Sequence, residues 1–250
     1  MNQKLINYIF QLADNNLILG QRLSEWCGHA PELEIDIALT NIALDLIGQS
    51  RNLYSYSAEL EGKGRTEDDM AYLRDCEAYR NVLLVEQPNE DFAYTIARQF
   101  FFDVYNHLFY KELVNSKDEQ LAAIAEKSLK EINYHIRFSS EWMIRLGDGT
   151  DVSHAKMQTA VDDLWDYIGE MTIMNETDRL MLAEGIGVDL NKIRTAYFHK
   201  VKEILSEATL NIPEEEPFQK GGKDGLHSEH LGHLLTELQW MQRAYPGAEW

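Results

Sequence analysis

Apolar side chains recur at alternating steps of four and three residues over long parts of the chain. The first stretch has one polar member, Asn16, in the series Leu5, Ile9, Leu12, Asn16, Leu19, Leu23 and Trp26. The second has one polar member, Gln49, in the series Ile35, Leu39, Ile42, Leu46, Gln49, Leu53 and Tyr56. Such steps place a buried stripe along one side of an α-helix, so both stretches are predicted to be long helices packed in a bundle.

Turn residues and prolines divide the rest of the chain into further helices. Only five prolines occur in 250 residues, and long proline-poor intervals favour helices over many short strands. Ser153 is the expected N-cap of the fifth long helix. The predicted helices cover residues 5–26, 31–61, 91–115, 118–146, 153–174, 191–208 and 228–244, with short helical pieces within 66–85 and at 176–184, and a loop over 209–226.

The first four long helices are predicted to form two antiparallel hairpins. Helices 5–26 and 31–61 make one pair, helices 91–115 and 118–146 make the other, and a longer crossover joins them. Two such pairs form a ferritin-like, up-down four-helix bundle. The sequence therefore predicts an all-α fold with this bundle as its core and additional C-terminal helices. Because no low-complexity linker interrupts the chain, residues 1–250 are expected to form a single domain.

The composition is that of a globular protein with many acidic residues. Hydrophobic residues make up 44% of the chain and charged residues 26%, and the formal net charge is −19. This charge argues against binding to nucleic acid or to an anionic membrane, since both need a basic surface. There is no long apolar run or signal-peptide core, and Cys27 and Cys76 are too few for a disulfide framework, so a cytoplasmic protein with reduced thiols is expected.

Residues at the centre of the predicted bundle correspond in position to a di-metal site. Di-metal bundles take one carboxylate from each of two helices and a Glu-x-x-His pair from each of the other two. Asn16 and Leu46 are 30 residues apart, and Asp103 and Ile132 are 29 apart, as two similar hairpins require. The six equivalent positions are Asn16, Leu46, Gln49, Asp103, Ile132 and His135.

Of these six positions, only Asp103 and His135 carry residues that bind metals. A buried di-cation held by one carboxylate and one imidazole would keep several unbalanced positive charges, which is costly in a dry core. We therefore expect no metal or other cofactor in this chain. Instead, Asp103 and His135 are predicted to form a hydrogen-bonded pair, with Asn16 and Gln49 as the remaining polar core residues. A residual metal at Asp103 and His135 is the alternative.

Several longer motifs resemble one enzyme family. The family is the bacterial phenylacetyl-CoA epoxidase (ring 1,2-monooxygenase) complex, and both of its large subunits have similar motifs. In this chain the motifs are Trp26-x-x-x-Ala30-Pro31, Asp45-x-x-Gly48-Gln49, Asp103 and Lys130-Glu131-x-x-Tyr134-His135. The catalytic subunit of that family has Asp-Glu-Ala-Gly-His where this chain has residues 45–49. The non-catalytic subunit is the closer match over the whole chain, at residues 24–36, 84–89, 149–153 and 221–250.

This resemblance implies a ferritin-like bundle that acts as a partner and has no chemistry of its own. In that family, a catalytic di-iron subunit uses O2 and electrons from a reductase to epoxidise the aromatic ring of phenylacetyl-CoA, during aerobic phenylacetate breakdown. The expected partners are therefore the di-iron subunit, a further small subunit and the reductase. Two alternatives stay open. One is an active di-metal oxidase with unusual ligands, namely Asp45, Asp103, Glu131 and His135, and the other is a self-assembling helical protein such as a homodimer.

Two polar segments are candidates for contact with coenzyme A. The first is Cys76-Glu77-Ala78-Tyr79, which lies between Arg74 and Arg80, and the second is Thr177-Asp178-Arg179. The resemblance implies that loops of the non-catalytic subunit lie near the coenzyme A held by its partner, and arginine suits phosphate. Ordinary solvated loops are the alternative.

Three further features permit a binding role as well as a structural one. His227, His230 and His233 could bind zinc from one side of a helix, or could simply form a partly exposed helix start. The glycine-rich residues 221–225 could surround a phosphate, although they lack the order of a P-loop. Asp14 lies roughly opposite Asn16 on its helix and is expected to form a salt bridge or to lie at the surface.

Overall fold

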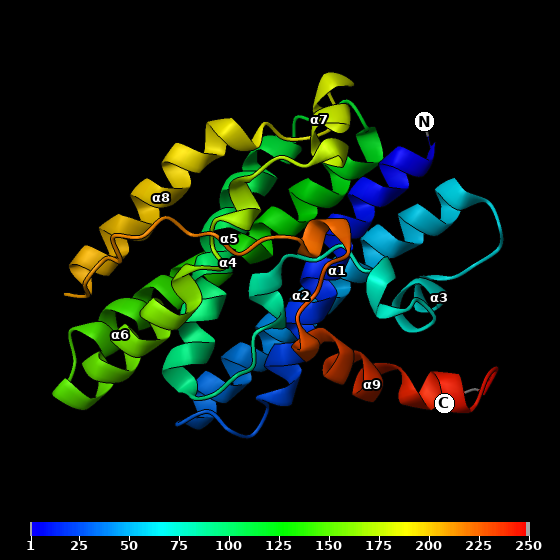
Figure 1. The fold of residues 1–250 in the computed structure, drawn as a ribbon. Helices are drawn as coiled ribbons and strands as arrows, with labels where there is room; N and C mark the ends of the chain where they lie inside the picture. Colours follow the sequence, from blue (N-terminus) through cyan, green and yellow to red (C-terminus); the bar gives the residue numbers. More distant parts are fainter. Residues whose placement is uncertain (1, 249–250) are drawn as a thin grey trace.

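The computed structural model describes residues 2–248, so the end of the predicted 221–250 motif lies outside the described residues. Its long elements are all helices, and the described part of the chain contains no strand (Figure 1). The helices are α1 Asn2–Glu25, α2 Leu33–Glu61, α3 Glu67–Tyr72, α4 Phe92–Leu113, α5 Glu119–Gly147, α6 Asp151–Trp165, α7 Glu176–Ala183, α8 Leu190–Glu207 and α9 Glu229–Ala244. Short 3-10 turns are η1 Cys76–Ala78, η2 Leu83–Glu86, η3 Glu170–Thr172 and η4 Gly222–Asp224.

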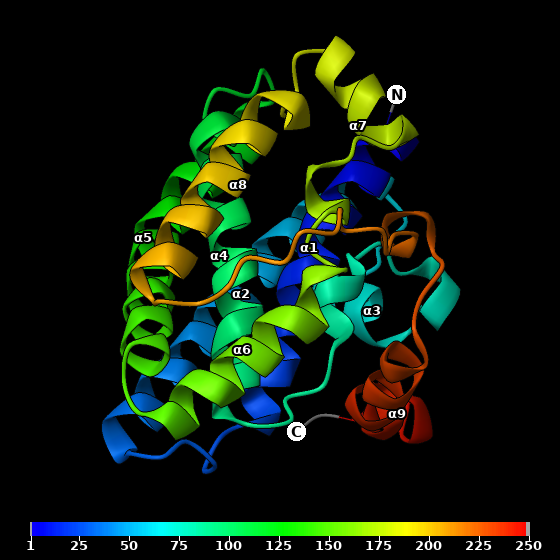
Figure 2. The same cartoon turned by 60° about the vertical axis from the view of Figure 1, so that its left-hand side comes forward.

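The four long helices pair as predicted. α1 packs along α2, α4 packs along α5, and α2 contacts α5 across the bundle. α1 reaches α4 through large side chains, such as Tyr8 and Phe109, whose ring centroids are 6.5 Å apart. The chain thus forms the expected all-α, ferritin-like bundle. α6 and α8 lie along the α4 and α5 side, and α3 and α9 lie on the other side (Figures 1 and 2).

The aromatic residues of α4 belong to the core. Phe100, Phe101, Phe102, Tyr105 and Phe109 are all at most 5% exposed. α4 contacts α5, α6 and α8 as well as α1, so several of its sides are covered within this one chain. Burial of five large rings stabilises the bundle by several kcal/mol, at roughly 1.5–3 kcal/mol for each side chain. These residues therefore provide internal packing and are not available as an interface.

The fifth long helix, α6, differs from the prediction at both ends. Thr150, and not Ser153, is the N-cap, because the Thr150 hydroxyl accepts from the Ser153 amide at 3.2 Å and the Ser153 hydroxyl accepts from the Thr150 amide at 3.0 Å. α6 ends at Trp165, nine residues before the predicted end at 174. The loop after α8 packs there, since the Trp165 indole donates to the Glu215 carbonyl at 2.8 Å.

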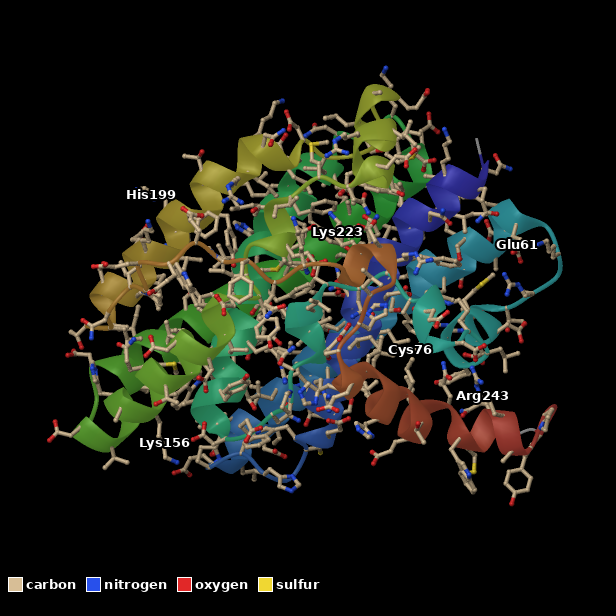
Figure 3. All side chains as sticks on the ribbon, viewed as in Figure 1. Glu61, Cys76, Lys156, His199, Lys223 and Arg243 are labelled. Atoms are coloured by element: carbon tan, nitrogen blue, oxygen red, sulfur yellow. The ribbon has the colours of Figure 1, made fainter. Side chains whose placement is uncertain are left out.

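The last helix, α9, is attached to the α3 side of the bundle. The Gln239 amide donates to the carbonyls of Ala71 at 3.1 Å and Arg74 at 3.0 Å. The Arg243 guanidinium binds Asp75 at 3.0 Å, and Cys76 and Arg243 lie on this side of the molecule (Figure 3). Within residues 2–248, none of the helices is both long and apolar enough to cross a membrane.

Candidate functional site

The six predicted site positions lie buried between the four bundle helices. α1 carries Asn16, α2 carries Leu46 and Gln49, α4 carries Asp103, and α5 carries Ile132 and His135. None of these residues is more than 2% exposed. Leu46 and Ile132 belong to the continuous hydrophobic core, so apolar side chains fill the places where a di-metal bundle has carboxylates.

Asn16 and Gln49 form a chain of hydrogen bonds across the core. The Asn16 amide donates to the Gln49 side-chain oxygen at 3.4 Å and to the Tyr110 hydroxyl at 3.3 Å. The Gln49 amide in turn donates to Glu131 at 2.9 Å. Periodicity alone does not mark Tyr110 as a partner, although it shares a face with Asp103, seven residues earlier. These contacts satisfy polar groups without a metal.

His135 does not form the predicted hydrogen bond with Asp103. Its Nε2 lies 3.0 Å from an oxygen of Asp45, a partly exposed residue of α2, and its Nδ1 has no hydrogen-bond partner. Asp103 instead accepts from the Gln99 amide at 2.7 Å, one turn earlier on α4. The periodic apolar positions of the sequence predicted which side of each helix faces inward. They did not fix which of two neighbouring carboxylates the imidazole reaches.

Burial weakens the acidity of Asp103. The side chain is fully buried, and this raises its pKa from 3.8 to about 6, although His135 and the hydrogen bonds of Ser139 and Gln99 act in the opposite direction. Removing the carboxylate from water disfavours its charged form, and this effect on the pKa is larger than those of His135, Ser139 and Gln99. A fraction of Asp103 therefore keeps its proton when the surrounding solution is only mildly acidic.

Four polar atoms of this region have no hydrogen-bond partner within the described residues. They are Gln99 Oε1, Asp103 Oδ2, Asn106 Nδ2 and His135 Nδ1. The first three residues lie on one side of α4, and His135 lies on the facing helix α5. Buried polar groups normally have a partner, so internal water is the simplest companion for these atoms.

The donor set of this core does not fit a di-iron centre. Asn16, Leu46, Gln49 and Ile132 offer neither a carboxylate nor an imidazole. Across residues 2–248, no group of three or more His, Cys, Asp or Glu side chains is arranged to hold a metal. A buried di-iron centre needs several anionic ligands to balance its charge, and this core lacks them. We therefore derive no reaction step through iron in this chain.

Asp45 and Glu131, the other two carboxylates of the di-metal oxidase alternative, each form a hydrogen bond with a side chain of the core. Glu131 accepts the Gln49 amide, and Asp45 faces His135 Nε2 from a position at the edge of the core. Neither carboxylate converges with Asp103 on a common point with a third ligand in the described structure. The arrangement favours a hydrogen-bonded core over a metal site with unusual ligands.

The arginines around residues 76–79 are occupied. Arg74 is 7% exposed and forms a salt bridge with Asp14, whose carboxylate also accepts from Tyr54 at 2.5 Å. The Arg80 guanidinium donates to the carbonyls of Glu77 at 2.7 Å and of Tyr79 at 2.6 Å. The prediction of a salt bridge for Asp14 is confirmed, although Asp14 is fully buried and not at the surface. Contact of residues 76–79 with coenzyme A stays a prediction, and the bonds of Arg74 and of Arg80 Nη1 to the chain itself do not favour a role of these two arginines in phosphate binding.

The second candidate loop lies in α7. Asp178 is buried and pairs with Lys223, while Arg179 is exposed beside a groove of about 540 Å³ that Lys220 also lines. Lys223 belongs to η4, near the middle of the view in Figure 3. Coenzyme A contact at Thr177, Asp178 or Arg179 stays a prediction, and among the three only Arg179 presents an exposed cation.

The glycine-rich residues 221–225 surround a side chain of the chain itself. Glu170 accepts from the amides of Leu83 at 2.9 Å, Gly221 at 2.8 Å and Lys223 at 3.2 Å. Gly222 packs so closely that an added Cβ would lie 2.2 Å from the Asn81 carbonyl oxygen. The Glu170 carboxylate thus occupies the place that a phosphate would need, and the loop is ordered by this contact.

The three histidines near the start of α9 do not converge. His227 Nδ1 lies 2.5 Å from Glu86 Oε1, and its Nε2 lies 3.0 Å from the Tyr79 carbonyl oxygen. His233 is exposed, and the three residues do not belong to any metal-binding group in the part of the chain that the structure describes. Glu86 is the residue that sequence reasoning missed, because no periodic pattern marks it.

Comparison with known proteins identifies relatives of the whole chain. The sequence profile of a family described as phenylacetic acid catabolic protein matches residues 1–250. The chain is also 53% identical over 250 residues to one of the subunits of the 1,2-phenylacetyl-CoA epoxidase of Escherichia coli strain K12, with 100% of both chains covered. The similarity therefore includes all four bundle helices, the core positions and the C-terminal segment.

Proposed function

The chain belongs to the phenylacetic acid catabolic protein family, and we propose that it is the structural, non-catalytic subunit of a 1,2-phenylacetyl-CoA epoxidase complex. One observation carries the non-catalytic assignment. Four of the six positions that hold a di-iron centre in such bundles carry Asn16, Leu46, Gln49 and Ile132. These residues pack or hydrogen-bond with each other and with their neighbours.

In this proposal, the chemistry takes place in a partner. A catalytic subunit with its own di-iron centre activates O2 and epoxidises the aromatic ring of phenylacetyl-CoA, and a reductase supplies the electrons. A further small subunit completes the complex. The present chain holds the catalytic subunit in its active shape by binding it as a second helical bundle. It contributes no metal ligand and no proton donor to the reacting atoms.

The outer side of α2 is a suitable surface for this partner. Leu33, Ile37 and Leu44 are 70%, 52% and 60% exposed, and their spacing places them on one side of the helix. We call these three residues the α2 apolar stripe. Exposed apolar residues that line up along one helix mark sites of protein association more often than isolated ones do. We propose that the catalytic subunit covers the α2 apolar stripe.

Co-purification tests the proposed role. The chain is co-expressed with the catalytic subunit, one of them tagged, and the complex is isolated. We expect Leu44→Asp and Ile37→Asp to reduce the recovered partner at least tenfold, because an aspartate in an apolar contact loses hydration without a counter-charge. Val152→Asp is the matched control, since Val152 is 68% exposed on α6 and does not belong to the stripe.

Two outcomes would contradict the proposal. If the wild-type chains do not co-purify and the catalytic subunit is soluble and active alone, the supporting role is wrong. If the purified single chain contains about two iron ions and turns over phenylacetyl-CoA, the chain is itself a di-metal oxidase. Equal recovery of the partner with the α2 variants and with Val152→Asp would place the docking surface elsewhere.

A further inference from the structure

One of the contacts that hold the C-terminal segment, residues 226–244, to the bundle is made by a buried carboxylate. Glu86 at the end of η2 is fully buried. Its Oε2 accepts from the Ser228 amide at 2.9 Å and from the Ser228 hydroxyl at 2.6 Å. Its Oε1 accepts from the Asn81 amide at 2.8 Å and lies 2.5 Å from His227 Nδ1. Glu86 therefore contacts the two residues that lead into α9.

The contacts of His227 fix the number of protons in this cluster. The Tyr79 carbonyl oxygen can only accept, so His227 Nε2, at 3.0 Å, must carry a hydrogen. A neutral imidazole would then present a bare lone pair on Nδ1 to a carboxylate oxygen 2.5 Å away. Two lone pairs repel at that distance, whereas a shared proton produces a strong, charge-assisted hydrogen bond. The pair Glu86 and His227 thus holds one proton.

We propose that this shared proton fastens the C-terminal segment to the bundle and that the segment is released as the pH rises. An unburied histidine loses its proton near pH 6.5, so opening the contact at neutral or alkaline pH sheds one proton. If the closed form loses this proton, the lone pairs of His227 Nδ1 and Glu86 Oε1 repel each other. The inference concerns a conformational equilibrium of this chain and does not depend on the proposed function.

The neighbouring charged groups do not replace this proton. On α1, Arg22 donates to the Glu86 carbonyl at 2.7 Å and not to its carboxylate, and Arg80 is used by the carbonyls of residues 77 and 79. On η1, burial raises the pKa of Cys76, and the charges of Glu86 and Glu77 add to this effect. Burial and nearby carboxylates, Glu86 among them, likewise raise the pKa of Tyr167. Lys223 is engaged by Asp178, and Glu170 accepts three backbone amides.

One substitution should keep the contact while removing the need for the proton. In Glu86→Gln, the amide oxygen can still accept from Ser228, and the amide nitrogen can donate to a neutral His227 Nδ1. The second hydrogen of the glutamine amide can be donated to Asn81 Oδ1, an oxygen that is buried without a partner, if the side-chain amide of Asn81 rotates by half a turn. His227→Ala removes the imidazole and its shared proton and leaves the two bonds from Ser228.

Amide hydrogen exchange of the full-length chain between pH 7 and pH 9 tests the proposal. Protection factors of residues 229–244 are corrected for intrinsic exchange and compared with those of α1 and α2. In the wild-type chain, we expect protection of α9 to fall about tenfold for each pH unit, since opening releases one proton. In Glu86→Gln, protection should not change with pH, and in His227→Ala protection should be lower than in the wild-type chain at pH 7 and should not change with pH.

His233→Ala is the matched control, because His233 is an exposed histidine of the same helix. It should behave like the wild-type chain. The proposal is overturned if protection of wild-type α9 does not change with pH relative to α1 and α2. It is equally overturned if Glu86→Gln keeps the wild-type pH dependence, or if His227→Ala leaves α9 as protected as in the wild-type chain.

Discussion

At the scale of single residues, the bundle core contains polar side chains whose charges are suppressed or shared. Asp103 has a raised pKa because it is buried, and His135 reaches Asp45 at the edge of the core. Asn16 and Gln49 bond to each other and to Tyr110 and Glu131. The anionic ligands of a di-metal site are balanced by the charge of the metals, whereas here the neutral amides of Asn16 and Gln49 stand at two ligand positions.

Asp103 should make the chain less stable as the pH rises. Burial raises its pKa from 3.8 to about 6, so between these pH values the folded chain binds more protons than the unfolded chain. The free energy of unfolding therefore falls as the pH rises through this window, by about 3 kcal/mol in total for this group. Asp103→Asn resembles the protonated form and should remove this loss.

Urea unfolding at pH 5 and at pH 8 checks this expectation. Asp103→Asn should raise the free energy of unfolding about twice as much at pH 8 as at pH 5, because about half of the window between pH 3.8 and 6 lies below pH 5. Asp163→Asn, on the exposed side of α6, is the control and should follow the wild-type chain at both pH values. If the free energy of unfolding changes by the same amount between pH 5 and pH 8 in the wild-type chain and in Asp103→Asn, Asp103 is not the responsible group.

The sequence located the core positions but not their bonds. Alternating steps of four and three residues placed Asn16, Gln49 and His135 on buried sides of their helices, which the structure confirms. The same steps cannot tell whether His135 reaches Asp103 or Asp45, because that choice depends on side-chain direction and on the distance between helices. Glu86 was missed because it lies in an irregular crossover with no periodic pattern.

At the scale of elements, single contacts between chain segments determine how the outer parts attach to the bundle. Arg74 follows α3 and is buried against Asp14 of α1, with its guanidinium also stacked at 4.3 Å over the ring of Phe10. This ion pair joins the crossover to the first helix. The bounds of the long helices were predictable to within a few residues, except for α6. The loop that follows α8 packs against Trp165, the residue at which α6 ends.

Removing the Arg74 guanidinium should strongly destabilise the chain. Arg74→Met leaves the Asp14 carboxylate buried without its counter-charge, which costs about 3–5 kcal/mol. The double variant Arg74→Met with Asp14→Asn should lose less stability than the sum of the losses in the two single variants, because no uncompensated charge is buried. Chemical denaturation measures all three. Arg51→Met is the control, since Arg51 is 73% exposed in its pair with Glu67 and should change stability by less than about 1 kcal/mol.

Two glycines at helix positions should respond in opposite ways to alanine. A Cβ at Gly147, the last residue of α5, would lie 2.4 Å from the Ala208 carbonyl oxygen, so Gly147→Ala should destabilise by about 1–3 kcal/mol. Gly48 lies inside α2 and a Cβ there meets nothing within 4 Å. Gly48→Ala should therefore stabilise by up to about 1 kcal/mol. Thermal unfolding compares the two, and a loss of stability in Gly48→Ala would refute this account.

At the scale of the whole molecule, packed apolar side chains and hydrogen-bonded amides occupy positions where di-metal bundles carry ligands. Leu46 and Ile132 are fully buried, and each such side chain contributes about 1.5–3 kcal/mol to stability. Unmetallated carboxylates at these positions would have cost free energy instead. With its α2 apolar stripe exposed, the chain keeps the shape of a di-iron bundle and a surface for a partner. Under the proposed function, this stripe is the surface that the catalytic subunit covers.

The most direct test of this account is the turnover of phenylacetyl-CoA by the reconstituted complex in which this chain carries Asp103→Asn and His135→Gln together. Among the six equivalent positions, these two carry ligand-type residues. We predict that the complex forms, as gel filtration will show, and that its turnover equals that of the wild-type complex, because the proposed function assigns the reacting atoms to the catalytic partner. A loss of turnover of about tenfold or more, equivalent to 1.4 kcal/mol in the barrier, in a complex that is otherwise intact would contradict the account.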